Sequence, residues 1–186
     1  MARLIPELDP ALIEHEGERR VYLAARDLPE DYTVIYAYKF CDQITGAVIW
    51  QADLIILHPF KGYIVLKIHH GEVGWFNGRW HEFVQGGYRE IKTDPVGEAR
   101  NAAYAVARSY KEKTGWPFPL SFESGLCFPQ CSKIEGQLPA FIKPANLLLR
   151  RDVENFTAKI SEIFLAMPRE RRDRAAMQRL VEHILM

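Results

Sequence analysis

The residues VIWQADLIILHPFKGYIVLKIH, numbered 48–69, decide the fold of this chain. Two runs rich in valine, isoleucine and leucine, Val48–His58 and Tyr63–His69, have the composition of β-strands. The four residues between them, PFKG, contain the proline and glycine that are typical of a tight turn. The stretch therefore predicts a β-hairpin, and its long apolar runs place that hairpin in the core of a sheet.

Polar side chains interrupt the apolar pattern of this hairpin. Successive side chains of a strand point to opposite faces, so Lys67 and His69 share one face, while Leu66 and Ile68 share the other. We expect Asp53, on the first strand, to face Lys67 across the pair. Polar groups next to a core are costly unless they have partners. Two interpretations are open: a structural salt bridge between Asp53 and Lys67, or a functional site built from Asp53, Lys67 and His69.

Working outward, the sequence predicts an α/β (α+β) fold with a central mixed β-sheet flanked by helices. Residues 1–13 contain two prolines and are expected to form an irregular arm. Residues 14–150 are expected to form the main domain, and residues 151–186 a C-terminal helical extension. In chain order, the predicted elements outside the central hairpin are a helix over Glu14–Leu28, a strand over Tyr32–Phe40, a hairpin of Glu72–Phe76 and Arg79–Phe83, a helix from Pro95 to Gly115, strands over Ser124–Phe128 and Asn146–Leu149, a helix over Val153–Met167 capped by Asp152, and a helix over Arg171–Leu185.

Composition limits the functions that this chain can have. The 186 residues include 24 Lys+Arg and 24 Asp+Glu, so the net charge is zero and any binding of nucleic acid must be local. Three cysteines without a signal sequence do not predict a disulfide framework, and the expected compartment is the cytoplasm. No run of 18 apolar residues predicts a membrane span.

Two candidate metal motifs have simpler explanations. Adjacent residues on a strand point to opposite faces, so His69 and His70 are not expected to bind one ion together. Cys127 and Cys131 have a spacing near that of zinc ligands, but a second cysteine pair is missing. We expect these two cysteines to be small buried hydrophobic residues.

Several short motifs occur in a characteristic order. The segments QADLIILHP (51–59) and GYIVL (62–66) follow GERRV (17–21) and precede GRW (78–80), DPVGEAR (94–100) and FP (128–129). Together they resemble the nuclease-related domain (NERD) family, from about Glu14 to Phe128. The resemblance implies a PD-(D/E)XK nuclease-like fold with a restriction-endonuclease-like core. It is closest to the NERD domains that precede the motor of UvrD/Rep-type DNA helicases.

The resemblance implies a site that this sequence matches only in part. In active members of that fold, carboxylates hold Mg²⁺ and a lysine positions or activates the attacking water. Glu18 and Asp53 match the acidic residues of the family pattern. Lys67 stands where the family has glutamate, His69 where it has lysine, and Glu98 where glutamine is usual. We therefore expect a degenerate site.

The exchange at Lys67 has the largest electrostatic consequence. A metal ligand is lost, and a cation is placed beside the ion, where a pair of unit charges at about 4 Å is worth about 4 kcal/mol at an effective dielectric constant near 20. Each 1.4 kcal/mol corresponds to about tenfold in affinity. Glu98 offers a rescue, because it can supply the missing carboxylate, and His69 can act as a general base or ligand.

Three interpretations of function are open at this point. The first is a DNA-processing or nucleic-acid-binding domain without cleavage, with Arg79 and Arg100 as candidate contacts and helicase domains, in cis or in trans, as partners. The second is an active Mg²⁺- or Mn²⁺-dependent DNase with Glu18, Asp53 and Glu98 as ligands. The third is a protein-interaction module that does not bind nucleic acid. The sequence does not indicate an oligomeric state.

Overall fold

The computed structural model describes residues 1–168 and 173–186. Its centre is a six-stranded sheet in the order β1-β2-β3-β4-β8-β10. The three strands from β2 to β4 are antiparallel, whereas β1 pairs with β2, β8 with β4 and β10 with β8 in parallel. The predicted mixed sheet is therefore confirmed. The bounds of the strands are β1 (Arg3–Ile5), β2 (Thr33–Cys41), β3 (Val48–His58), β4 (Gly62–Ile68), β8 (Phe122–Cys127) and β10 (Leu147–Leu148).

The hairpin β3–β4 forms as the sequence predicts. Leu54 pairs with Leu66 and His58 pairs with Gly62, so the turn occupies the predicted residues. Gly62 has φ +104, and a Cβ at this position would lie 1.7 Å from the carbonyl oxygen of Ser121. The glycine is therefore needed both for the turn and for the close approach of the chain that leads into β8.

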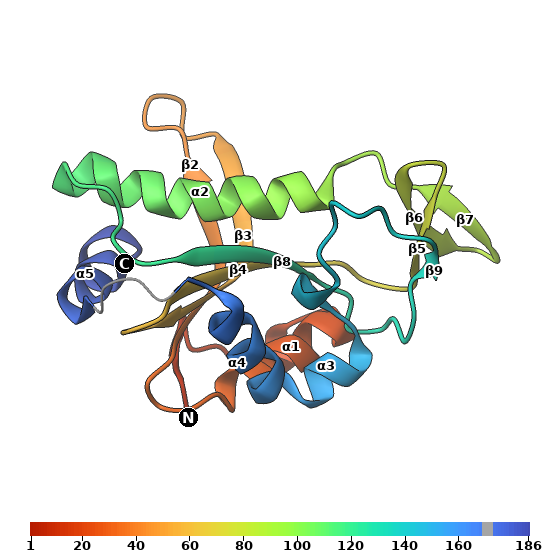
Figure 1. Ribbon diagram of the computed structural model, residues 1–186, viewed down its shortest axis with the longest axis horizontal. Coiled ribbons are helices and arrows are strands. Elements are labelled where there is room, and N and C mark those ends of the chain that lie inside the picture. The colour runs from red at the N-terminus through yellow and green to blue at the C-terminus, as the bar shows by residue number, and fades with distance from the viewer. Residues whose placement is uncertain (169–172) are drawn as a thin grey trace.

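Helices cover both faces of the central sheet (Figure 1). One face carries α1 (Glu16–Arg26), α3 (Arg150–Glu154) and α4 (Phe156–Ala166). The other face carries α2 (Pro95–Thr114), with α5 (Arg174–Arg179) and the π-helical turn η3 (Leu180–Ile184) near its C-terminal end. The 3₁₀ turns η1 (Pro10–Leu12) and η2 (Pro144–Asn146) lie in the connecting segments.

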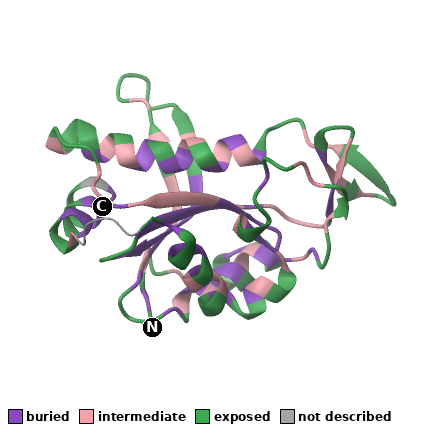
Figure 2. Ribbon diagram, viewed as in Figure 1, coloured by how far each residue is buried: buried purple, intermediate pink, exposed green. Residues whose placement is uncertain are grey.

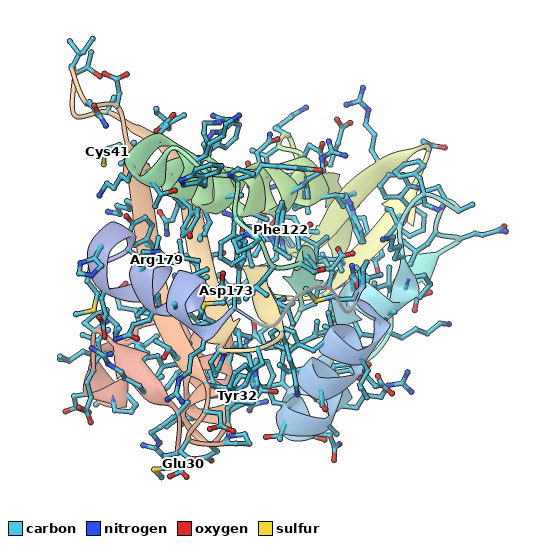
Figure 3. All side chains as sticks on the ribbon, turned by 60° about the vertical axis from the view of Figure 1, so that its left-hand side comes forward. Glu30, Tyr32, Cys41, Phe122, Asp173 and Arg179 are labelled. Atoms are coloured by element: carbon cyan, nitrogen blue, oxygen red, sulfur yellow. The ribbon has the colours of Figure 1, made fainter. Side chains whose placement is uncertain are left out.

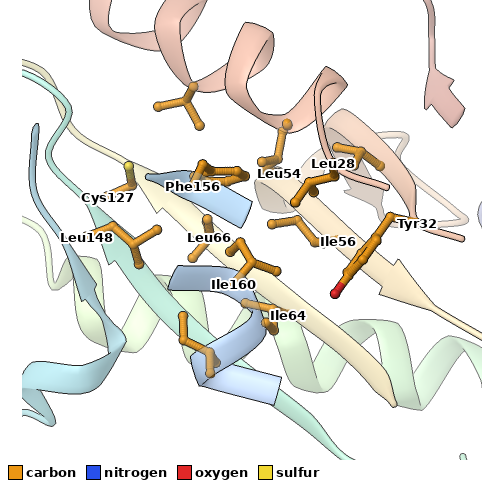
Figure 4. Packing of buried hydrophobic residues seen from close by; sticks show 14 of the residues in the cluster. Leu28, Tyr32, Leu54, Ile56, Ile64, Leu66, Cys127, Leu148, Phe156 and Ile160 are labelled. Carbon is orange, nitrogen blue, oxygen red and sulfur yellow. The ribbon is translucent and has the colours of Figure 1, made fainter. Parts of the chain in front are cut away.

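The two faces of the hairpin contribute to two separate cores. Ile64, Leu66 and Ile68 pack with residues of α1 and α4 (Figure 4), and Tyr63 and Val65 pack with α2 and the C-terminal helix. The helices are buried where they face the sheet and exposed on their outer sides (Figure 2). The alternation read from the sequence is thus confirmed for this hairpin.

A second, smaller sheet lies beyond the N-terminal end of α2 (Figure 1). Its order is β7-β6-β5-β9, and its first hairpin turns at Asn77 and Gly78 as predicted. Trp80 is 4% exposed and packs with Phe128 and Cys131 in a third core. The bounds of the strands are β5 (Val73–Phe76), β6 (Arg79–Val84), β7 (Gly87–Glu90) and β9 (Glu135–Gly136).

Three expectations about secondary structure need correction. The arm contains β1, which is too short to give an alternating pattern. The helix expected over Val153–Met167 is divided at Asn155, whose ψ of 41 breaks the helical path. Asp152 does not precede the helix: it lies inside the first turn, and its Oδ2 accepts the backbone N–H of Leu149 at 2.8 Å.

The last predicted helix begins partly outside the described residues. Within those residues, α5 starts at Arg174, and the side chain of Asp173 accepts the backbone N–H of Ala176 at 2.9 Å. Cys127 and Cys131 are buried and free, as expected. Among residues 1–168 and 173–186, no helix combines the length and apolar character needed to cross a bilayer.

Candidate functional site

Asp53 and Lys67 meet on the face of the hairpin that α2 covers. Leu54 pairs with Leu66 in an antiparallel arrangement. Asp53, which precedes Leu54, therefore stands opposite Lys67, which follows Leu66. The Nζ of Lys67 lies 3.8 Å from Oδ2 of Asp53. The predicted contact across the hairpin is confirmed.

The carboxylate of Asp53 takes part in the hydrogen bonding of the sheet. Its Oδ2 accepts the backbone N–H of Ile68 at 2.8 Å, and its Oδ1 accepts Nε2 of Gln51 at 3.4 Å. Burial raises the pKa of Asp53, and this effect exceeds the opposing effects of the Ile68 N–H and of Lys67. The net effect of these surroundings is therefore to disfavour the ionised form of Asp53 relative to a carboxyl in water.

Glu98 completes a carboxylate–ammonium–carboxylate arrangement. It lies in the first turn of α2, and its Oε2 is 3.4 Å from Nζ of Lys67. The side chain of Lys67 is 28% exposed, compared with 12% for Asp53 and 31% for Glu98. One ammonium group thus lies between a buried carboxylate and a half-buried one.

Glu18 approaches the site from α1 and has a partner of its own. Tyr36, on β2, donates its hydroxyl hydrogen bond to Oε1 of Glu18. Burial raises the pKa of Tyr36, and the adjacent Glu18 adds to the rise, so the phenol stays a donor. The charge of Glu18 also raises the pKa of Asp53. The structure brings Glu18 within electrostatic range of Asp53, but among the described residues no hydrogen bond or ion pair joins Glu18 to Lys67 or Glu98.

His69 is joined to the second sheet and not to the carboxylates of the site. Its Nε2 lies 3.3 Å from Oε2 of Glu82 on β6, and Glu82 also accepts a hydrogen bond from Arg89 at 2.6 Å. Burial lowers the pKa of His69, and the charge of Glu82 opposes this change. The imidazole is therefore neutral at pH 7 and does not supply a fixed positive charge.

The two candidate arginines lie apart from this group. Arg79 is on β6 and forms an ion pair with Glu90 at 3.2 Å. Arg100 is on α2, two residues after Glu98, and two residues correspond to about 200° of rotation around a helix. Arg100 therefore lies on the opposite flank of α2 from the Lys67–Glu98 ion pair.

Two adjoining grooves open beside the site. A groove of about 250 Å³ is lined by Trp50, Lys67 and Glu98, among others. A groove of about 520 Å³, between the β2–β3 hairpin and the later part of α2, is lined by Trp50, Lys39 and Arg108, among others. Trp50 and Ile49 line both grooves, so the two are neighbours. Cys41, which also lines the second groove, is labelled beside α2 in Figure 3.

A comparison with protein families agrees with this architecture. The model of the nuclease-related domain matches residues 13–129, which is more than half of the chain. The chain belongs to the nuclease-related domain family. Neither the curated proteins nor the solved structures contain a significant match.

The side chains of this nuclease-related domain do not fit a divalent metal ion. Mg²⁺ requires close oxygen ligands in octahedral geometry, and the ammonium of Lys67 stands between the two carboxylates that would approach such an ion. Within residues 1–168 and 173–186, no three His, Cys, Asp or Glu side chains are grouped to hold a metal. The ammonium of Lys67 occupies the place beside Asp53 and Glu98 where a metal ion would lie.

Three residues of the nuclease-related domain site were not predicted from its sequence. Tyr36, Gln51 and Glu82 bind Glu18, Asp53 and His69, respectively. Gln51 stands two residues before Asp53 on one strand face, and this spacing is the available signal. Tyr36 and Glu82 belong to other elements, and only the packing of these elements brings them close.

Proposed function

We propose that this nuclease-related domain binds DNA without a divalent metal and does not cleave it. The observation that carries the proposal is the ammonium of Lys67, which lies 3.8 Å from Asp53 and 3.4 Å from Glu98. A metal ion at this place would have to displace an attached positive charge from two carboxylates. The repulsion between the Lys67 ammonium and a metal ion therefore lowers the affinity for the metal, as expected from the sequence.

The position of His69 supports the absence of cleavage. The family resemblance implies a lysine here that positions or activates water, and a neutral imidazole bound to Glu82 supplies neither its charge nor its reach. Asp53, Lys67 and His69 are in this proposal the remains of a catalytic group. Their present role is to hold the β3–β4 hairpin in a fixed relation to α2 and to the second sheet.

The proposed DNA contact lies in the two adjoining grooves. The net charge is zero, so attraction for phosphates must come from a local group of cations. Lys39 and Arg108 are exposed and line the larger groove, which adjoins the groove of Lys67. Neither has an ion-pair partner among the described residues. The adjoining side chain of Trp50 offers a surface for a base or sugar.

The biological setting belongs to the same proposal. The resemblance to domains that precede UvrD/Rep-type motors supports association with a DNA helicase, in cis or in trans. It supports a role in DNA repair in the same way, and the cytoplasm is the compartment expected from the cysteine content. The family match supports a nuclease-related function at the level of the family.

A binding and cleavage assay tests the proposal. Fluorescence anisotropy with single-stranded and duplex DNA is measured in EDTA, in Mg²⁺ and in Mn²⁺, and the products are examined on a gel beside those of Asp53→Ala. We expect equal affinity in all three conditions and no cleavage. The double variant Lys39→Gln/Arg108→Gln should make the negative slope of log affinity against log salt shallower, by about 0.9 for each lost duplex phosphate contact. Lys111→Gln, an exposed lysine of α2 outside both grooves, is the matched control and should leave the slope unchanged.

Two results would contradict the proposal. Metal-dependent cleavage that disappears in Asp53→Ala would show an active DNase with a rearranged site. Absence of DNA binding in every condition would favour a protein-interaction module.

A further inference from the structure

A third groove lies on the flank of α2 that faces away from Lys67. It has a volume of about 330 Å³ and runs between the first half of α2, the strand β8 and the segment around Phe141 and Asn146. Phe122, at the start of β8, lies close to α2 (Figure 3). The proposed DNA contact of the preceding subsection uses none of the residues that line this groove.

Aromatic rings form the walls of this groove. Tyr104 is 54% exposed, and its ring meets that of Phe122 edge to face, with centroids 5.3 Å apart. Phe122 is itself stacked on the buried Tyr63, with centroids 5.1 Å apart. Phe141 is 74% exposed and contacts Trp75 edge to face at 6.2 Å. Two rings are thus fixed from behind by other rings while much of their surface stays open to a ligand.

A free cation stands at the rim. Arg100 is exposed and lines the groove, and within the described residues its guanidinium has no hydrogen-bond or ion-pair partner. The other cation, Lys143, is already 3.4 Å from the carboxylate of Glu123. An unpaired guanidinium is suited to bind one phosphate with two parallel hydrogen bonds.

Polar groups on the floor can recognise the edge of a base. Asn146 donates from Nδ2 to Glu123 at 3.2 Å and to the carbonyl of Ser124 at 3.1 Å. These bonds fix the amide and leave its oxygen without a partner among the described residues. A fixed amide oxygen and the Glu123 carboxylate are acceptors for amino and imino N–H groups of bases.

We propose that this groove binds one nucleotide of a single-stranded nucleic acid. The base lies against Tyr104 and Phe141, its edge faces Asn146 and Glu123, and its phosphate is held by Arg100. A base in a duplex is stacked on its neighbours and cannot enter a groove of this kind, so the ligand is single-stranded. The inference rests on the proposed binding of DNA and names the strand form that this second surface selects.

The test compares one oligonucleotide as a single strand and as a duplex. Anisotropy is measured in EDTA for the native protein, Tyr104→Ala and Phe141→Ala. Each variant should bind the single strand about tenfold more weakly, because stacking of one base on an aromatic ring is lost. Binding of the duplex should change less than about twofold, which is within the uncertainty expected for an untouched site. Trp116→Ala is the control, because Trp116 is also 74% exposed but lies outside the groove.

Arg100→Gln separates the phosphate contact from the base contact. The slope of log affinity against log salt for the single strand should fall by about 0.7, the value for one lost phosphate contact. Lys111→Gln, on the same helix, should not lower it. Circular dichroism checks that each variant is folded, and the exposed position of all five side chains makes this the expected result.

The outcomes distinguish this inference from the proposal on which it rests. If Tyr104→Ala and Phe141→Ala bind DNA as strongly as the native protein does, only the assignment of this groove to a nucleotide is overturned. The groove would then bind a partner of another class. Equal losses on the single strand and the duplex would overturn the strand preference. A native protein that binds neither form would overturn both proposals.

Discussion

Burial destabilises the ionised form of Asp53, and the hydrogen-bond and ion-pair partners of this residue offset only part of that effect. Burial raises its pKa in the folded protein although Ile68 donates a hydrogen bond to it and Lys67 lies 3.8 Å away. A raised folded pKa means that this group favours folding below the ordinary pKa of aspartate. That contribution is lost as the pH rises through the folded value.

Replacement of Asp53 by asparagine should therefore stabilise the protein in a pH-dependent manner. Asparagine can still accept the Ile68 N–H, but it carries no charge to desolvate. At pH 7 we expect a higher Tm for Asp53→Asn than for the native chain, and the difference should vanish below about pH 4. Thermal unfolding followed by circular dichroism across this range gives the measurement. A Tm difference that does not change with pH would contradict the role assigned to desolvation.

His58 should make the fold sensitive to acid. It is 7% exposed, and its Nδ1 accepts the backbone N–H of Phe60 at 3.2 Å. Burial, together with the nearby Lys61, lowers the pKa of His58 to about 4. The unfolded chain binds a proton near pH 6.5, so stability is complete above that value and falls as the pH drops toward about 4.

The expected loss from His58 is at most on the order of 3 kcal/mol. Urea unfolding at several pH values measures it, and His58→Asn should flatten the dependence because asparagine keeps an acceptor for Phe60 without titrating. An unchanged slope in His58→Asn would assign the acid sensitivity to other groups.

Periodicity in the sequence predicts which residues of the site meet only where they share a hairpin. Alternation along β3 and β4 was enough to place Asp53 opposite Lys67, because the register of a hairpin is local information. The contact of His69 with Glu82 depends on how the second sheet is folded against the first. No periodicity within one strand contains that information.

At the scale of elements, the turn between β3 and β4 depends on its glycine more than the C-terminus of α2 does. Gly62 and Gly115 both have positive φ, of +104 and +77. A Cβ at Gly62 would lie 1.7 Å from the Ser121 carbonyl oxygen, whereas a Cβ at Gly115 would meet nothing within 4 Å. Alanine at Gly115 therefore tests the backbone conformation alone, whereas alanine at Gly62 tests the conformation and a steric contact together.

Alanine at these two glycines should give different losses of stability. Gly115→Ala should cost about 1 kcal/mol, the conformational penalty of a left-handed residue. Gly62→Ala should cost more than about 3 kcal/mol, because β8 or the turn must move as well. Urea unfolding of both variants gives the comparison. Similar losses for the two would show that β4 and β8 are not held as closely as the structure indicates.

Elements with a clear start, turn or stop signal were predicted well, and elements without such a signal were not. α2 has a proline at its start and a left-handed glycine at its end, and both were read from the sequence. β1 and β7 are three and four residues long, too short for a periodic signal. The break at Asn155 reflects the packing of α3 against β10 and α1, which is tertiary information.

At the scale of the whole molecule, the C-terminal helix is part of a core. Met177, Leu180 and Val181 pack with α2 and with the face of the sheet that contains Val65. The expectation of a separate C-terminal extension stays a prediction about domain organisation, but these buried contacts show that the segment contributes to packing. Its removal would expose the apolar residues it covers.

Leu180→Ala measures that contribution. Leu180 is 0% exposed, so the substitution should cost about 2–5 kcal/mol. Leu165→Ala, at a position that is 59% exposed on α4, is the control and should change stability by less than about 0.5 kcal/mol. Equal effects in chemical unfolding would mean that the C-terminal helix does not stabilise the sheet.

The family and the mixed sheet could be predicted from ordered motifs spread along the chain. The arrangement of grooves around α2 could not, because it depends on which side of the helix each element packs. Arg100 illustrates the difference: it is only two residues from Glu98 yet lines a separate groove. Local sequence identifies such residues as candidates, and only the fold sorts them into sites.

The most direct test of the central claim is the binding of Mn²⁺ by the native protein and by Lys67→Glu. If the ammonium of Lys67 holds the place of a metal ion, the native chain should show no saturable Mn²⁺ site in calorimetry or electron paramagnetic resonance. Lys67→Glu should bind at least about 100-fold more tightly, since about 3 kcal/mol of repulsion is removed. Addition of Asp53→Asn to Lys67→Glu should abolish that site. Tight Mn²⁺ binding by the native chain that is lost in Asp53→Asn would contradict the claim.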